Sequence, residues 1–186
     1  MNKNNLDKNK KIVFAGGPGT GKSTLINEFQ NDNYQVMNEV SREIVHEARQ
    51  NGVEHLFISD PLAFSNKLLE KRKEQYVRAD HLFDGPVFID RGIPEITAYL
   101  DFNNAQYPEY FIDANKKYIY DKIYIFPIWK EIFKQDDVRY ETFQQSVEIQ
   151  EHLIRTYRSL GYELVEIPKT DTKIRKKFVL DQLANE

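Results

Sequence analysis

The glycine-rich run at residues 16–23, GGPGTGKS, has the residue types and spacing that most directly indicate chemistry. It matches the pattern G-x-x-x-x-G-K-[ST] at every fixed position. Glycines let the backbone curl so that N–H groups point at an anion, and the following helix adds its positive dipole end. We expect Lys22 to reach the β- and γ-phosphates and the Ser23 hydroxyl to hold Mg²⁺. The predicted triphosphate site comprises Gly16, Gly17, Pro18, Gly19, Thr20, Gly21, Lys22, Ser23 and Thr24.

An Asp-Arg pair, Asp90-Arg91, follows the apolar run VFI. An aspartate at the end of a buried strand is a common second support for Mg²⁺, so Ser23 and Asp90 are the predicted metal residues. Many ATP-hydrolysing proteins place a glutamate after this aspartate to activate water, whereas this chain has Arg91. We expect Arg91 to bind an anionic group of an acceptor or to stabilise charge in the transition state. A surface role alone is the alternative for this pair.

A second acidic residue, Glu39, follows the apolar stretch YQVMN in the segment NEVSRE. Its carboxylate is predicted to accept the proton of an acceptor hydroxyl as a general base. Arg42 comes one helical turn later on the same face and is predicted to hold the acceptor or orient Glu39. The predicted substrate-binding residues are thus Glu39, Arg42 and Arg91. The alternative is that Glu39 only favours the positive end of the next helix.

A charged insertion, IWKEIFKQDDVRYET, follows a later apolar run and suits a short lid that closes over the triphosphate. Arg139 within it is predicted to stabilise the transferring phosphoryl group, although an ordinary charged loop would have the same composition. The predicted catalytic residues are then Lys22, Glu39, Asp90, Arg91 and Arg139. Aromatic rings crowd residues 99–126, where stacking on an acceptor and simple packing are both open. The run EKRKE at 70–74 is expected to be a solvated helix face.

Five apolar runs at residues 11–15, 34–38, 86–90, 122–127 and 162–168 are predicted to be strands. Helical patterns alternate with them, notably at 22–30, 40–52, from Pro61 onward, at 142–160 and at 171–184. Strands alternating with helices predict an α/β fold with a parallel sheet covered by helices on both faces. Ligands of such sheets bind beyond the carboxyl ends of the strands. The polar residues that follow each strand are therefore expected to converge on one site.

The composition of the chain limits the kinds of site and partner that we expect. The chain has 186 residues, a formal net charge of −3 and no cysteine, so disulfides and thiolate metal sites are excluded. We expect residues 1–10 to be a flexible tail and residues 11–186 to form a single domain. No apolar run is long enough to cross a bilayer. The balance predicts a cytoplasmic monomer or small homo-oligomer that uses neither nucleic acid nor a membrane as a partner.

The set GGPGTGKST, NEVSREI, VFIDRG, DDVRYE and YRSLGYELVEIP resembles the P-loop family of small predicted ATPases that shares an AAA domain (AAA_28) with ribosylnicotinamide kinases. The resemblance runs from about Lys11 to Phe178. It implies a P-loop NTPase three-layer sandwich like that of nucleoside and nucleotide kinases, with a short lid. It also implies a carboxylate after the second strand, an acidic residue with an arginine after the third, and lid arginines.

These observations predict a phosphotransferase that uses Mg²⁺ and ATP and acts on a small hydroxyl-bearing acceptor, with nucleosides, nucleotides and ribosylnicotinamide as candidates. No Asn-Lys-x-Asp series for reading guanine is present, so ATP is the expected nucleotide and GTP stays open. The competing hypothesis is a nucleotide-binding switch or slow ATPase or GTPase that acts through a protein partner. An acceptor would discriminate between the two hypotheses.

Overall fold

The computed structural model describes residues 10–53, 56–82, 85–134 and 141–185. Its centre is a five-stranded parallel sheet in the order β2-β3-β1-β4-β5. The strands are β1 (Lys11–Ala15), β2 (Gln35–Met37), β3 (Val87–Asp90), β4 (Lys122–Ile125) and β5 (Leu164–Glu166). The five predicted strands are confirmed, with bounds that are shorter than expected for all but β1.

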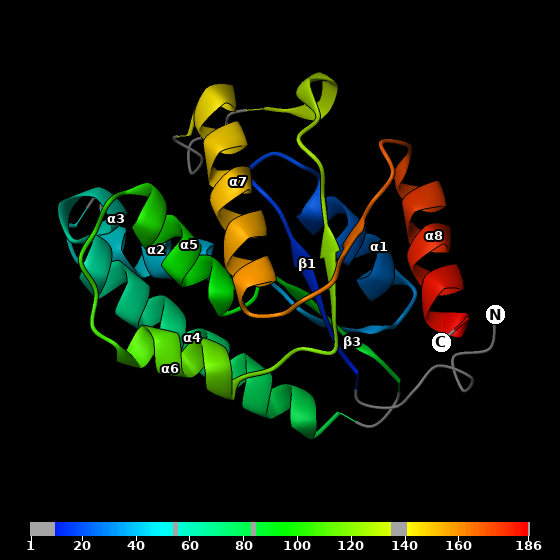
Figure 1. Ribbon diagram of the computed structural model, residues 1–186, viewed down its shortest axis with the longest axis horizontal. Helices are drawn as coiled ribbons and strands as arrows, with labels where there is room; N and C mark the ends of the chain where they lie inside the picture. Colours follow the sequence, from blue (N-terminus) through cyan, green and yellow to red (C-terminus); the bar gives the residue numbers. More distant parts are fainter. Residues whose placement is uncertain (1–9, 54–55, 83–84, 135–140, 186) are drawn as a thin grey trace.

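Helices cover both faces of this sheet (Figure 1). Helices α1 and α8 lie on one face, and α4, α5, α6 and α7 lie on the other. The bounds are α1 Lys22–Asn31, α2 Ser41–Gln50, α3 Leu56–Ser59, α4 Pro61–Asp80, α5 Pro94–Phe102, α6 Tyr110–Lys117, the 3₁₀ turn η2 Lys130–Ile132, α7 Phe143–Ser159 and α8 Thr172–Ala184. The predicted three-layer sandwich is therefore confirmed.

Alternation along β1 builds the two cores. Ile12 and Phe14 point toward α1 and α8, while Val13 and Ala15 point toward the opposite helices. All four side chains are fully buried, so β1 is the buried strand that the apolar run KIVFA predicted.

Local capping explains where two of the helices begin. Asp60 accepts a hydrogen bond from the Ala63 N–H at 2.8 Å, and Pro61 occupies the first turn of α4, where the sequence predicted a helix to begin. Thr142 and Gln145 form a reciprocal capping box at the start of α7. These caps fix the entry of the two helices that approach the functional site.

Strands flank β1 on both sides: β3 and then β2 lie on one side, and β4 and then β5 lie on the other. The carboxyl end of β1 is thus the point where the strand order reverses, and it opens into the glycine-rich run. Within the described ranges, no helix has the length and apolar character that a membrane span requires. Apart from Lys10, the tail predicted over residues 1–10 lies outside the described residues.

Candidate active site

The glycine-rich loop joins β1 to α1 and encloses the Lys22 ammonium. Lys22 Nζ donates to the carbonyl oxygens of Gly16 and Gly17 at 2.7 and 2.8 Å, and to the Thr20 hydroxyl at 3.2 Å. Gly21 takes a φ of 90°, which favours glycine directly before the helix. The ammonium therefore occupies the centre of the loop. A bound phosphate would accept its hydrogen bonds in place of these carbonyl and hydroxyl oxygens.

Burial sets the charge state of this lysine. Burial, helped by the neighbouring Arg91 and opposed by Asp90, lowers the pKa of Lys22 to about 7. A bound triphosphate would favour the ammonium form, because an opposite charge at close range raises the pKa of a buried lysine.

Helix α7 holds the first half of the loop through two polar side chains. Gln150 Oε1 accepts from the Gly17 N–H at 2.7 Å, and Gln150 Nε2 donates to the Phe126 carbonyl at 3.1 Å. The Ser146 hydroxyl donates to the Pro18 carbonyl at 2.8 Å. A Cβ on Gly17 would lie 2.7 Å from the Ser146 carbonyl oxygen, so glycine is required by this close approach. Sequence reasoning missed both α7 residues, because nothing in a helical pattern indicates a contact 133 residues away.

On its other side the loop contacts the first turn of α8. Arg175 Nη1 donates to the Thr20 carbonyl at 3.2 Å, and Arg175 Nε donates to the Pro168 carbonyl at 3.0 Å. The guanidinium lies over the Trp129 ring, 4.9 Å from its centroid. The ring of Phe133 covers Gly19, where a Cβ would lie 2.5 Å from the ring. The loop is therefore held by α7, α8 and the segment that follows β4.

Ser23 and Asp90 meet as the sequence predicted. The Ser23 hydroxyl donates to Asp90 Oδ2 at 2.7 Å, and Asp90 Oδ1 is buried without a hydrogen-bond partner. Burial and the nearby Glu39 carboxylate together raise the pKa of Asp90 to about 6, against the opposing effect of Lys22 and Arg91. A hydroxyl beside a carboxylate with an unpaired oxygen fits Mg²⁺, which takes one or two protein ligands and completes its shell with phosphates and water. Among the described residues, no group of three or more His, Cys, Asp or Glu side chains is placed to hold a metal ion.

Two buried arginines bind the Glu39 carboxylate. Arg91 Nε lies 2.5 Å from Glu39 Oε2, and Arg72 Nη2 lies 3.4 Å from Glu39 Oε1. Arg72 also donates to the Gly92 carbonyl at 2.8 Å, and Arg91 Nη1 donates to Glu95 Oε2 at 2.8 Å. Burial alone would raise the pKa of Glu39, but Arg72 and Arg91 hold it below its ordinary value. The carboxylate is thus ionised and fixed in place.

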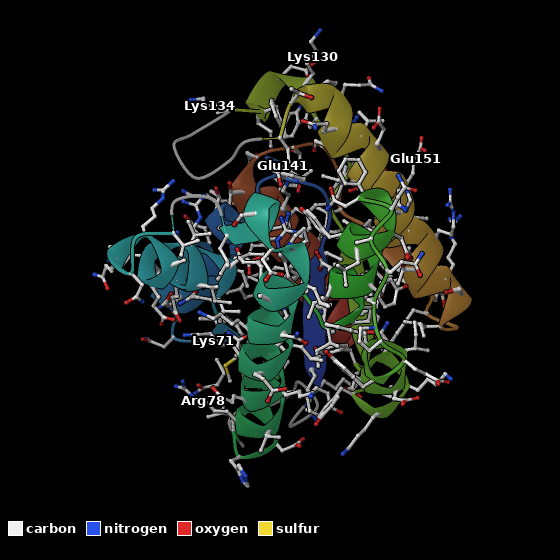
Figure 2. All side chains as sticks on the ribbon, turned by 90° about the vertical axis from the view of Figure 1, so that its left-hand side faces the viewer. Lys71, Arg78, Lys130, Lys134, Glu141 and Glu151 are labelled. Carbon is white, nitrogen blue, oxygen red and sulfur yellow. The ribbon has the colours of Figure 1, made fainter. Side chains whose placement is uncertain are left out.

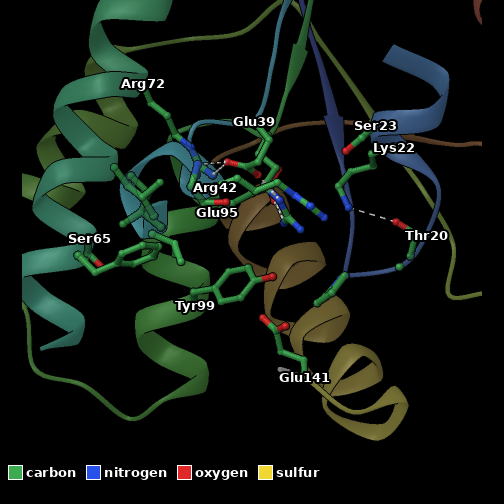
Figure 3. A pocket seen from close by; sticks show the side chains of 18 of the residues that line it. Thr20, Lys22, Ser23, Glu39, Arg42, Ser65, Arg72, Glu95, Tyr99 and Glu141 are labelled. Carbon is green, nitrogen blue, oxygen red and sulfur yellow. Dashed lines mark hydrogen bonds and ion pairs between the residues drawn. The ribbon is translucent and has the colours of Figure 1, made fainter. Parts of the chain in front are cut away.

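A cavity of about 220 Å³ opens beside this network and reaches the phosphate loop. Figure 3 shows its labelled polar side chains: Lys22, Ser23, Glu39 and Arg42 lie on one side, with Tyr99 and Glu141 facing them. The apolar part of the wall is formed by Val45, Phe64, Leu68, Ile96, Tyr99 and Leu100. Such a mixture of apolar wall and few polar groups is typical of small-molecule sites.

The structure brings most of the predicted site residues together. Lys22, Ser23, Thr24, Glu39, Arg42 and Arg91 line the cavity, as do Pro18, Gly19, Thr20 and Gly21. Gly16 and Gly17 lie behind them as acceptors of the Lys22 hydrogen bonds. Arg139 lies outside the described residues, as does much of the predicted lid, so its role stays a prediction. The site residues Arg72, Glu95 and Glu141 were missed.

One expectation about the surface needs correction, and the two alternatives left open for the aromatic rings each apply to some of them. Arg72 belongs to the run EKRKE, which was expected to be solvated, yet Arg72 is only 4% exposed because it turns inward toward Glu39 and Gly92. Of the rings within residues 99–126, Tyr99 reaches the cavity wall, whereas Phe111, Tyr120 and Tyr124 are buried in the cores. In Figure 2, Arg78 and Lys134 lie at the periphery, and Glu141 lies nearer the centre beside the start of α7.

Comparisons with known proteins agree with this architecture. The family model AAA_28, described as an AAA domain, matches residues 11–175. A deoxyadenosine kinase from M. mycoides, solved with dCMP and dCDP, superimposes with a TM-score of 0.70 at 16% identity over 95% of this chain and 100% of that one. Thymidylate kinase from Candida albicans gives 0.69 at 15% identity over 96% and 92% of the two chains.

A third solved structure is the NadR protein in complex with NAD and AMP-PNP. It matches with a TM-score of 0.68 at 17% identity over 95% of this chain, and this chain spans 49% of that protein. No curated protein matches the sequence itself. At these identities the structural likenesses establish the fold.

Proposed function

The chain belongs to the AAA_28 family of AAA domains, and from that premise we propose that it is a kinase: it transfers the γ-phosphoryl group of Mg-ATP to a hydroxyl of a small acceptor. The observation that carries this proposal is the position of Glu39. Its carboxylate lines the same cavity as Lys22 and Ser23, so an acceptor in the cavity would have a base on one side and the triphosphate on the other. The structural neighbours, which include kinases for nucleosides and nucleotides, support the same class.

In the proposed reaction, the acceptor hydroxyl oxygen forms a bond to the γ-phosphorus. The bond from that phosphorus to the bridging oxygen breaks, and its electron pair leaves with ADP. The hydroxyl proton passes to Glu39. Because the transition state of phosphoryl transfer is loose, the proton is removed late, and the low pKa of Glu39 does not prevent it from acting as acceptor.

Lys22 and Arg91 are assigned the role of stabilising the negative charge on the transferring phosphoryl group. Both donate to the Gly16 carbonyl, at 2.7 and 3.3 Å, so both cations lie at the same end of the loop. Ser23 and Asp90 would hold Mg²⁺, which when bound neutralises phosphate charge. Arg42, which is exposed at the cavity edge on α2, is assigned the role of binding the acceptor.

The charges of the cavity favour an acceptor that reacts through a hydroxyl over one that reacts through a phosphate. Arg72 and Arg91 are already matched by Glu39 and Glu95, so they offer little excess positive charge to a second phosphate group. A phosphate is moreover already ionised and needs no base, which would leave the carboxylate without a role. Together with the apolar wall, this supports a nucleoside or a molecule of similar size and chemistry.

The test is ADP release from Mg-ATP in the presence of single acceptors: nucleosides, ribosylnicotinamide and nucleoside monophosphates. We expect one nucleoside-like acceptor to raise the rate, and Lys22→Ala to remove the increase. Glu39→Gln should lower kcat by about 10²–10⁴-fold, the usual contribution of a positioned base. The matched control is Glu163→Gln, an exposed glutamate remote from the cavity lining.

ADP release that is indifferent to every acceptor would overturn the kinase proposal. It would favour the nucleotide-binding switch or slow NTPase instead. An increase with nucleoside monophosphates alone would keep the reaction class but overturn the preference for a hydroxyl acceptor.

A further inference from the structure

Arg91 lies between two carboxylates and the phosphate loop. Its Nε lies 2.5 Å from Glu39 Oε2, while its Nη1 donates to Glu95 Oε2 at 2.8 Å and to the Gly16 carbonyl at 3.3 Å. The residue also takes a φ of 75°, in the left-handed region that arginine rarely adopts. Such a backbone persists where the surrounding contacts fix it, and it is typical of functional sites.

The two oxygens of Glu39 have different surroundings. Oε1 accepts from the Ser41 N–H at 3.0 Å and contacts Arg72 at 3.4 Å. Oε2 contacts Arg91 but has no hydrogen bond of acceptable geometry, although it is buried. Oε1 is therefore the oxygen that orients the carboxylate, and Oε2 is the oxygen left for another donor.

The contact between Arg91 and Glu39 Oε2 conflicts with the proposed transfer of a proton to Glu39. Oε2 is the atom that would receive the acceptor proton, yet Arg91 occupies its neighbourhood in the ligand-free protein. The same arginine lies within hydrogen-bond reach of the loop that would hold the γ-phosphate. A phosphoryl group carries more negative charge than one carboxylate and offers more acceptor oxygens, so it would compete for the guanidinium.

We propose that Arg91 exchanges partners: it pairs with Glu39 in the empty site, moves to the γ-phosphate when the triphosphate binds, and thereby leaves Glu39 Oε2 to the acceptor hydroxyl. The inference rests on the proposed function, because the exchange has a purpose only if a hydroxyl follows. Glu95 is the positioning residue of the exchange.

The contacts of Glu95 suit that role. Its carboxylate is fully buried and accepts from the Gly92 N–H at 3.3 Å and the Tyr157 hydroxyl at 3.4 Å, besides Arg91. Figure 3 shows Glu95 beneath Glu39, and the Arg91 Nη1 that it binds also reaches the Gly16 carbonyl. Glu95 can thus keep the Nη1 end of Arg91 in place while the Nε side changes partner. Binding of nucleotide would prepare the base before the acceptor arrives.

The test compares two ligands, AMP-PNP and ADP, each with Mg²⁺, by calorimetric titration of the full chain. If Arg91 must leave Glu39 to bind the γ-phosphate, Glu39→Gln removes the competitor. We expect this variant to bind AMP-PNP roughly 5- to 10-fold more tightly, while its affinity for ADP stays within about twofold. In an Arg91→Gln background, the same change should have no effect on either ligand.

The matched control is Glu95→Gln, which removes the same charge from the other side of Arg91. Because Glu95 is expected to stay paired in both states, this variant should not tighten AMP-PNP. Arg91→Met replaces Arg91→Gln if the amide variant does not fold, as judged by its thermal unfolding.

Two results would overturn the inference. Tighter binding of AMP-PNP in Glu39→Gln that persists without Arg91 would indicate plain charge repulsion. An unchanged ratio of AMP-PNP to ADP affinity would mean that Arg91 remains on Glu39. Because no acceptor is present, either result is independent of the acceptor screen, and a failed screen would leave this result standing as a fact about nucleotide binding.

Discussion

At the scale of single residues, Glu39 carries the largest consequence. It offsets the charges of Arg72 and Arg91, whose side chains are 4% and 14% exposed. Removing one partner of a buried ion pair leaves an uncompensated charge, which is more costly than losing an exposed pair. The ionised Glu39 carboxylate therefore stabilises the two arginines around it.

This predicts how stability depends on pH. The pKa of Glu39 is held below its usual 4.5 in the folded chain, by Arg72 and Arg91 against the effect of burial. A group with a depressed pKa stabilises the fold above its unfolded pKa, and this contribution is lost as pH falls through the folded value. We expect Glu39→Gln to lower the free energy of unfolding by about 3 kcal/mol at pH 7, with the difference from wild type shrinking below pH 4.5.

Urea unfolding at several pH values measures this difference, with Glu163→Gln as the control. A difference that stays constant into acid would show that Glu39 acts through shape and not through charge.

The same residue illustrates what sequence can reveal. Glu39 was found because it follows a strand, whereas Arg72 was misread because its burial depends on a contact 33 residues away.

At the scale of elements, helix α7 governs the phosphate loop. Gln150 satisfies the buried Gly17 N–H and reaches the end of β4 through its amide, so one side chain joins a helix, a strand and the loop. Losing it would leave a buried donor without a partner, a cost of about 1–3 kcal/mol. The loop's geometry thus depends on an element that the loop's own motif does not contain.

We expect Gln150→Met to lower the free energy of unfolding by about 1–3 kcal/mol and to weaken ATP binding several-fold. Gln144→Met, on the exposed side of the same helix, should change both by little. Urea unfolding and nucleotide titration measure the two effects. Lost stability with unchanged ATP affinity would make Gln150 a support of the fold alone.

Strands were predicted better than the helices between them. The apolar runs at 11–15 and 86–90 are short, and the first is followed by glycine while the second ends in a charged residue. Because buried parallel strands are apolar on both faces, these runs fit only a buried strand. Pro94–Phe102 form α5 and Tyr110–Lys117 form α6, two helices that the sequence did not indicate. Their rings, such as Tyr99 and Phe111, fit a strand, a helix or a binding surface equally well, and tertiary packing decides among these.

At the scale of the whole molecule, the parallel order of the sheet assembles the site. Glu39 follows β2, Asp90 ends β3 with Arg91 directly after it, and the phosphate loop follows β1. These strands are neighbours in the order β2-β3-β1. Residues separated by about half the chain meet because their strands end at the same edge. The sequence predicted this convergence in general, but not the order that places Glu39 beside Arg91.

Ligand binding should therefore stabilise the fold as a unit. At about 100 times its Kd, Mg-ATP is expected to add about 2.7 kcal/mol, which raises the unfolding temperature by roughly 5–10 °C for a chain of this size. Removing Mg²⁺ with EDTA should reduce this increase, and Asp90→Asn should reduce it equally in the presence of Mg²⁺. The control is Asp113→Asn, an exposed site on α6.

Thermal scans with and without Mg-ATP provide the measurement. A full temperature increase in EDTA, or in Asp90→Asn with Mg²⁺, would remove Asp90 from the metal site.

The ring that lies on Arg175 has an experimental consequence. Trp129 is the one tryptophan of the chain, and it contacts the guanidinium that donates to the phosphate loop at Thr20. Its emission under selective excitation comes from a single place, one side chain away from the phosphate loop. The protein therefore carries a built-in optical reporter, and the arrival and departure of nucleotide can be followed in real time on the unlabelled chain.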